Sequence, residues 1–289
     1  MSILYASPSK LETAALCRRK WWLIYIRKLK VQRGRQFMFG TVLHAAAERF
    51  LLDQQLWPDG WDLDPDTKER VTPSEGALIQ VLVQAGIDAG ILEKRPGGKV
   101  EQWIKIKHGD DVVVRGLIDY GTDIRVEDHK TSKSERYMKS PEGLRKSIQM
   151  MCYGKERIER FRQRGALPPK YITLAHNQFK KDFDDPMVRR REVEVTPAEI
   201  DTFWQETIVP LLEAMVSDQH LTDPFDLPDP PPKACRAFGG CEFVSICSGA
   251  EDLLSFERRM AKLMSQDKET KTTMTTSPSD FLSRRAGNA

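Results

Sequence analysis

Two short runs decide how this sequence is interpreted: Gly116-Leu117-Ile118-Asp119 and Glu127-Asp128-His129-Lys130-Thr131-Ser132. Apolar and β-branched residues lead into both runs, and Gly121-Thr122-Asp123 separates them with residues typical of a turn. We therefore expect a β-hairpin. A turn centred just after residue 123 places Asp119 directly opposite Asp128.

Two carboxylates on opposed strand residues lie roughly 5 Å apart and repel each other. A divalent cation between Asp119 and Asp128 removes that repulsion, and Mg²⁺ and Mn²⁺ prefer such oxygen ligands. The backbone carbonyl of His129 offers a third oxygen. Side chains alternate along a strand, so Lys130 shares the face of Asp128, where it can orient a water or stabilise charge. We expect a metal site for phosphodiester hydrolysis; an ordinary Asp–Lys pair on a surface hairpin is the simpler alternative.

Two further segments offer groups that suit this chemistry. His44 lies in a helical pattern that begins near Phe39, and an imidazole beside carboxylates favours Mn²⁺. A histidine among apolar residues is also common as a packed helix residue. Gln149 and Tyr153 are four residues apart and share one face of a helix expected over 141–164, where both can position a DNA strand or Lys130. Ordinary exposed polar side chains are the alternative here.

Three of the five cysteines follow a proline-rich linker at close spacing. Cys235, Cys241 and Cys247 need a fourth thiolate to complete a tetrahedral site, and Cys17 is the candidate. Such a site holds either zinc or an iron–sulfur cluster, and it would join the two ends of the chain. Cys152 lies beside two methionines in a helical pattern, so we expect it to be buried and without a metal.

A basic and aromatic segment runs from Cys17 to Gln36, with eight basic residues and no acidic one. Lysine and arginine bind phosphates and tryptophan stacks on bases, so the segment favours contact with DNA. An amphipathic helix with a solvated basic face is the alternative. The residues expected to contact DNA are Arg18, Arg19, Lys20, Trp21, Arg27 and Lys28.

In this order, the motifs resemble those of the PD-(D/E)XK nuclease superfamily, in the RecB-like branch that contains the iron–sulfur exonucleases associated with CRISPR systems and their phage relatives. The resemblance spans roughly residues 5–248. The matching motifs are Ser7-Pro8-Ser9-Lys10-Leu11 with Cys17, Gly40-Thr41-Val42-Leu43-His44, Gly116-Leu117-Ile118-Asp119, Asp128-His129-Lys130-Thr131-Ser132, Gln149 to Tyr153, and the three cysteines Cys235, Cys241 and Cys247.

The resemblance implies an α/β (α+β) fold of the restriction-endonuclease-like kind: a mixed central sheet flanked by helices, with a helical region clasped by the cluster. It implies a metal-dependent DNA exonuclease with a 4Fe–4S cluster. Many relatives have Cys-x2-Cys-x5-Cys where this chain has a first gap of five, which keeps zinc open as the alternative. The implied metal ligands are His44, Asp119, Asp128 and the His129 carbonyl; the implied catalytic residues are Asp119, Asp128, Lys130, Gln149 and Tyr153; the implied cluster ligands are Cys17, Cys235, Cys241 and Cys247.

Composition and the motifs together predict four segments. The 289 residues are 40 % hydrophobic and 30 % charged, which indicates a globular protein, and the net charge of +3 is too small to indicate a partner. We expect an N-terminal helix with the basic segment (1–38), a nuclease core (39–223), a three-cysteine segment (224–265) and a disordered tail (266–289).

The implied partner is DNA with free ends, in recombination, repair or CRISPR-type processing, together with proteins of those pathways. No signal peptide or membrane segment is evident, so we expect the cytoplasm of a bacterial or phage-infected cell. The alternative from another functional class is a non-catalytic DNA-binding subunit of recombination or repair, with a structural zinc site made of four cysteines.

Overall fold

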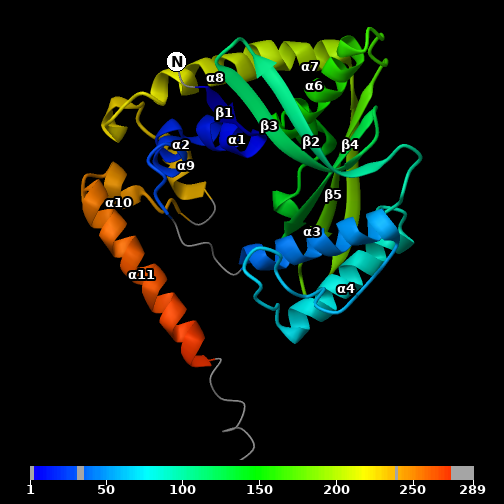
Figure 1. Cartoon of the computed structure of the whole chain (residues 1–289), viewed down its shortest axis with the longest axis horizontal. Helices are drawn as coiled ribbons and strands as arrows, with labels where there is room; N and C mark the ends of the chain where they lie inside the picture. The colour runs from blue at the N-terminus through cyan, green and yellow to red at the C-terminus, as the bar shows by residue number, and fades with distance from the viewer. Residues whose placement is uncertain (1–2, 31–35, 238–239, 275–289) are drawn as a thin grey trace, which may run out of the picture. The chain divides into compact units, whose positions relative to one another are not determined.

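The computed structural model describes residues 3–30, 36–237 and 240–274, with side chains for 3–30, 37–237 and 240–265. The chain divides into two compact units (Figure 1). Unit 1 comprises residues 1–15 and 34–220, and unit 2 comprises residues 16–33 and 221–289. These limits differ from the boundaries expected at residues 38 and 223, because the first strand and helix belong to the unit that holds the sheet.

Among the described residues, six strands form one mixed sheet at the centre of unit 1. Strand β3 pairs with β1 in parallel and with β2 and β4 antiparallel, while β4 pairs with β5 in parallel and β5 with β6 antiparallel. This arrangement confirms the predicted mixed sheet. The strands are β1 (Leu4–Ala6), β2 (Lys99–His108), β3 (Val112–Gly121), β4 (Arg125–Ser132), β5 (Ile172–Lys180) and β6 (Met187–Val195).

The hairpin of β3 and β4 has the register expected from the sequence, but its ladder is short. Tyr120 pairs with Glu127 and Gly121 with Val126, which centres the turn just after residue 123. Strand β1 pairs with β3 only at residues 112–114. Within the described strands, residues 115–119 of β3 therefore have no strand partner on the side shared by β1 and β4. We call this stretch the open edge of β3.

Helices cover both sides of the sheet in unit 1 (Figure 1). Helices α3 (Gln36–Asp53) and α4 (Pro73–Asp88) pack on each other and on strands, with a core that includes Leu43, Ile79 and Phe179. A capping box between Thr72 and Glu75 begins α4. Helix α6 (Ile148–Gln163) packs on β2, β4, β5 and α7. Helix α1 (Pro8–Leu16) ends at the first residue of unit 2. The remaining elements of unit 1 are η1 (Glu135–Tyr137), α5 (Pro141–Arg145), α7 (Pro197–Phe203), the single π turn η2 (Trp204–Ile208) and α8 (Val209–Asp218).

The prediction of a single helix over residues 141–164 is wrong, because the chain forms two helices there. Helix α5 ends at Arg145 and α6 begins at Ile148, after the N-cap residue Ser147. The Lys139 ammonium donates a hydrogen bond to the Ser147 hydroxyl at 2.7 Å, which holds the break in place. The break places Gln149 in the first turn of α6, at the end of the helix nearest the hairpin carboxylates.

Unit 2 combines one N-terminal helix with the C-terminal part of the chain. Its elements are α2 (Arg18–Tyr25), η3 (Pro224–Asp226), α9 (Pro232–Arg236), α10 (Val244–Cys247) and α11 (Leu253–Met274). Trp21, Trp22, Phe243 and Phe256 are buried in it, and the two phenylalanine rings lie 5.4 Å apart between centroids.

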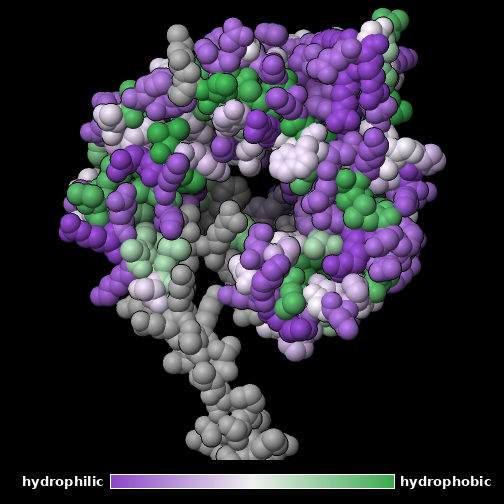
Figure 2. All heavy atoms as spheres, in the orientation of Figure 1, coloured by the Kyte–Doolittle hydropathy of each residue, from purple (hydrophilic) through white to green (hydrophobic). Residues whose placement is uncertain are grey.

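The tail expected to be disordered from residue 266 is helical as far as Met274, because α11 continues through glutamine, lysine and glutamate residues that favour a helix. The rest of that tail, residues 275–289, lies outside the described residues. Within the described part of the chain, none of the helices has the length and apolar character that crossing a membrane requires. Hydrophilic residues dominate the face seen over α6 and α7, and hydrophobic ones form small separate patches there (Figure 2).

Candidate active site

The hairpin residues predicted to bind metal lie together at the open edge of β3. The Asp128 side chain on β4 is buried, with 1 % of the residue exposed, and its Oδ2 lies 2.5 Å from the Lys130 ammonium nitrogen. The Asp119 Oδ2 accepts a hydrogen bond of 2.7 Å from the backbone N–H of His129. An N–H and a C=O of one strand residue point to the same edge, so the His129 carbonyl lies on the Asp119 side, as its predicted role as a ligand requires.

Helix α3 brings a histidine and a second carboxylate to Asp119. The His44 Nδ1 lies 3.5 Å from the Asp119 Oδ2. The ligand atoms of His44, Glu48 and Asp119 all lie within 4.8 Å of one another, close enough to share a metal ion. Gly40 permits this approach, because a Cβ there would lie 3.1 Å from the Thr131 hydroxyl oxygen on β4.

Glu48 was not among the predicted ligands, although the sequence carried a signal for it. It follows His44 by four residues in a helical pattern, and that spacing places both side chains on one face. Burial, followed by the negative charges of Glu101 and Asp119, raises the pKa of Glu48 to about 8. Glu101 itself adopts a φ of 48°, a strained conformation for glutamate. The Glu48 and Asp119 carboxylates, held this close, repel each other when both are ionised, and a divalent cation would remove that repulsion.

Two residues of α6, Gln149 and Tyr153, form hydrogen bonds to β4 and β3. The Gln149 side-chain amide donates to the Asp128 Oδ1 at 2.9 Å and to the Tyr153 hydroxyl at 3.0 Å. The Tyr153 hydroxyl in turn donates to the Leu117 carbonyl at 2.6 Å, on the open edge of β3. Burial and the nearby Asp128 charge raise the pKa of Tyr153, so its hydroxyl keeps its proton. Both residues therefore join α6 to the hairpin.

The environment of Lys130 determines which chemistry it can perform. Burial opposes its charge, but the carboxylates of Asp128 and Asp119 outweigh that effect and raise the pKa of Lys130 above its usual value of 10.5. The side chain is therefore a cation at neutral pH. A fixed ammonium stabilises negative charge on a phosphate better than it removes a proton from water.

Two buried histidines next to Asp128, His129 and His176, are neutral at physiological pH. His129 is fully buried, and burial lowers its pKa to about 3. His176 on β5 pairs with Asp128, and its Nε2 lies 3.6 Å from the Asp128 Oδ2. Burial lowers the pKa of His176 to about 4. Because His176 falls within a largely apolar strand pattern, no local motif assigns it to the site.

The four cysteines predicted to bind a cluster line one small cavity in unit 2: Cys17, Cys235, Cys241 and Cys247. Burial raises the pKa of the Cys247 thiol, whereas a hydrogen bond from Arg19 acts in the opposite direction. Cys152 lies in unit 1, where it is fully buried and where burial raises the pKa of its thiol. That location agrees with the inert role expected for it.

Two of the residues predicted to contact DNA, Arg19 and Trp21, are buried in the fold. Arg19 is 2 % exposed and donates to the Leu227 carbonyl at 3.0 Å, and Trp21 is 1 % exposed within the core of unit 2. Neither side chain can reach a DNA strand in this conformation, because the fold uses both for its own packing. The other members of the set lie nearer the surface: Arg18 is half-buried, Lys20 pairs with Glu242 at 2.8 Å, Arg27 pairs with Glu257 at 3.6 Å, and Lys28 is exposed.

Comparison with known proteins agrees with this geometry. A family model of the PD-(D/E)XK nuclease superfamily matches residues 5–248. The chain belongs to the PD-(D/E)XK nuclease superfamily. Membership in this superfamily implies a metal-dependent nuclease, and the His44, Glu48 and Asp119 group supplies suitable ligands. The RecB-like iron–sulfur branch stays a prediction from the motifs.

One solved structure adds support for the fold. The crystal structure of a candidate exonuclease from Eubacterium rectale is similar with a TM-score of 0.53 and 13 % identity, over 86 % of this chain and 89 % of that one. The structure of SSO0001 matches 47 % of this chain and 60 % of that one at 14 % identity, and its TM-score of 0.23 is too low to bear on the fold. A comparison with curated proteins found no match.

Proposed function

We propose that the chain is a Mg²⁺- or Mn²⁺-dependent DNA exonuclease, with its active site at the open edge of β3. The observation that carries the proposal is the close group of His44, Glu48 and Asp119 beside the Asp128–Lys130 pair. The preference for DNA ends rests on the sequence motifs and on the likeness to the Eubacterium rectale protein. Cytoplasmic location and a role in recombination, repair or CRISPR-type processing belong to the same proposal.

The residues fit a divalent metal, since they offer carboxylate oxygens and an imidazole to one point. When bound, such an ion would neutralise a phosphate and activate a water. His44, Glu48 and Asp119 would hold it, with the His129 carbonyl and Asp128 on the neighbouring strand. Lys130 would then stabilise the charge that develops on the phosphate in the transition state.

Digestion of end-labelled linear DNA tests this function, with a closed circular DNA of the same sequence alongside. We expect the linear DNA to be degraded with Mg²⁺ or Mn²⁺ and the circle to survive. Asp119→Asn should abolish the activity, whereas Asp123→Asn, which removes a similar carboxylate from the β3–β4 turn, should not. Equal cleavage of the circle would refute the preference for ends. Binding of both DNAs without cleavage would support the non-catalytic subunit instead.

We also propose that the cysteines of unit 2 hold a 4Fe–4S cluster that joins α2 to the C-terminal segment. The support is that four thiols from segments more than 200 residues apart in sequence line one cavity. Four thiolates suit an iron–sulfur cluster or zinc, and the motifs favour the cluster. Ligation of Cys17 would tie together two parts of the unit, so losing it should lower stability.

Metal analysis and visible absorption of anaerobically purified protein distinguish an iron–sulfur cluster from zinc. We expect iron with a broad visible absorption, and a loss of both in Cys17→Ser. Cys152→Ala serves as the matched control, because it removes a thiol from the other unit and should retain the iron. A colourless protein with one zinc per chain would replace the cluster by a zinc site, and unchanged iron in Cys17→Ser would exclude Cys17 as a ligand.

A further inference from the structure

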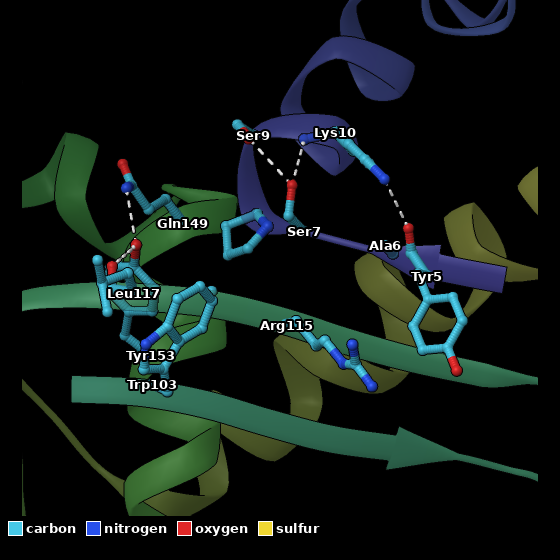
Figure 3. A pocket seen from close by; sticks show the side chains of 12 residues that line it. Tyr5, Ala6, Ser7, Ser9, Lys10, Trp103, Arg115, Leu117, Gln149 and Tyr153 are labelled. Atoms are coloured by element: carbon cyan, nitrogen blue, oxygen red, sulfur yellow. Dashed lines mark hydrogen bonds between the residues drawn. The ribbon is translucent and has the colours of Figure 1, made fainter. Parts of the chain in front are cut away.

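A cavity of about 370 Å³ lies along the open edge of β3, next to the proposed metal site. It lies within unit 1, and its walls come from three parts of that unit: the turn from β1 into α1, strands β2 and β3, and the start of α6 (Figure 3). The residues that matter below are Ser7, Lys10, Trp103, Arg115, Leu117 and Gln149. We call this cavity the β3 groove.

One end of the β3 groove is formed by residues already placed in the active site. Gln149 and Tyr153 line the groove, and the Gln149 amide also donates to the Asp128 carboxylate. Leu117 also lines the groove, and its carbonyl accepts the hydrogen bond from Tyr153. A ligand that fills the groove therefore contacts the residues that hold Asp128.

Trp103 gives the groove an exposed aromatic surface. It lies on β2 directly opposite Leu117, and 72 % of its surface is exposed. The rest of that strand alternates in the usual way, with Ile104 and Ile106 buried. A tryptophan left open to solvent beside a nuclease site is suited to stacking on a base, and every base of an unpaired strand offers a π face to it, whereas a duplex offers one only at its terminal base pair.

The far end of the groove is basic. The Arg115 guanidinium lies over the Tyr5 ring, 4.4 Å from its centroid, and the Lys10 ammonium donates to the Tyr5 carbonyl at 2.9 Å. Lys105 does not line the groove, but it lies opposite Arg115 in the β2–β3 ladder and is exposed. The Ser7 and Ser9 hydroxyls lie 3.0 Å apart on the opposite wall. Ammonium, guanidinium and hydroxyl groups are the usual contacts to phosphate oxygens.

We propose that the β3 groove binds a single DNA strand, with one base stacked on Trp103 and the following phosphates held by Arg115, Lys10 and Lys105. The inference rests on the proposed nuclease function and adds the path of its substrate. Arg115 precedes Asp119 by four strand residues, or about 13 Å, so the bound stretch is a few nucleotides long. A cavity of this volume matches a small ligand and not the width of a duplex.

Binding of a fluorescein-labelled oligothymidylate, followed by anisotropy in EDTA so that no cleavage occurs, tests the stacking contact. Trp103→Ala should weaken binding about 5- to 150-fold, the range for one lost base–aromatic stack. Trp103→Phe keeps a π face and should bind within a few-fold of wild type, which separates stacking from any folding defect of the alanine variant. Phe183→Ala removes another exposed aromatic, between β5 and β6, and should have no effect.

The salt dependence of the same binding tests the phosphate contact. Arg115→Gln should reduce the slope of log K against log salt by about 0.7, the value for one phosphate contact on a single strand. Lys170→Gln, an exposed lysine outside the groove, should leave the slope unchanged. The proposal is wrong if Trp103→Ala and Arg115→Gln both bind the oligonucleotide like wild type, or if they lose as much affinity for a blunt hairpin duplex.

Cleavage assays keep this inference separate from the proposed function. If wild type cleaves and Asp119→Asn does not, while the groove variants bind normally, the function stands and the strand path is refuted. If wild type cleaves nothing but Trp103→Ala loses single-strand binding, the groove stands and the nuclease activity is refuted.

Discussion

Replacing Glu48 by glutamine should stabilise the metal-free protein and weaken its response to metal. The ligand oxygens of Glu48 and Asp119 lie within 4.8 Å of each other. Two unit charges at that separation repel by about 1 kcal/mol in water and about 3 kcal/mol at the effective dielectric constant of ~20 found near protein surfaces. Glu48→Gln removes this repulsion at almost constant volume, so at pH 9, where Glu48 is ionised, the free energy of unfolding in EDTA should rise by about 1–3 kcal/mol.

The pH dependence of this effect has a definite sign. The pKa of Glu48 is raised to about 8 in the folded protein, so the folded state binds a proton that the unfolded state releases near pH 4.5. That group therefore contributes stability at low pH, and the contribution is lost as pH rises towards 8. The advantage of Glu48→Gln over wild type should be small at pH 5 and should grow up to pH 9.

Thermal unfolding followed by circular dichroism measures both effects. In EDTA at pH 9 we expect Tm to rise by about 2–8 °C for Glu48→Gln, and in a Mn²⁺ titration we expect a smaller rise of Tm than for wild type. Glu213→Gln, an exposed glutamate on α8, is the control and should change neither quantity. An unchanged or lower Tm in EDTA, together with an unaltered Mn²⁺ response, would refute the shared metal site.

Three further changes probe the residues around the metal ligands. Lys130→Ala should lower kcat by about 10²–10³ while metal-dependent stabilisation persists, because it removes one charge-stabilising donor; activity near wild type would contradict the role of Lys130. Gln149→Leu leaves the buried Asp128 without one hydrogen-bond donor and should cost about 1–3 kcal/mol in urea unfolding; a neutral result would show that the 2.9 Å bond contributes little. Gly40→Val should push α3 away from Thr131 and reduce the affinity for Mn²⁺, and adding Thr131→Gly should restore part of that affinity. Calorimetric Mn²⁺ titrations measure both effects. An unchanged affinity in Gly40→Val, or no recovery in the double variant, would contradict the prediction.

The sequence predicted the register of the hairpin correctly because the information for it is local. The turn residues after Tyr120 fix the register, and the period of two along a strand then fixes the faces. The motif around His44 can likewise be recognised from the spacing of residues within a single helix. What local patterns lack is the distance between segments, so Glu48 became a candidate ligand only once α3 was placed against β3.

The basic segment shows the opposite case. Its composition indicated contact with DNA, yet Trp21 and Arg19 are buried in unit 2. A run of arginine, lysine and tryptophan does not reveal which side chains face the core, because helix periodicity in eight residues is too short to separate the two faces. The aromatic residue proposed to meet DNA is instead Trp103, an exposed member of an edge strand whose significance depends on the open stretch of β3 beside it.

The make-up of unit 2 has a consequence for synthesis of the chain. Residues 16–33 leave the ribosome long before their partners, which begin at residue 221. At 5–20 residues per second, on the order of 10–40 seconds pass before those partners are made. During this time Trp21 and Trp22 lack the core that later buries them, and Cys17 has no neighbouring thiols. The nascent chain should therefore be most prone to aggregation, and most dependent on chaperones, until its last quarter emerges.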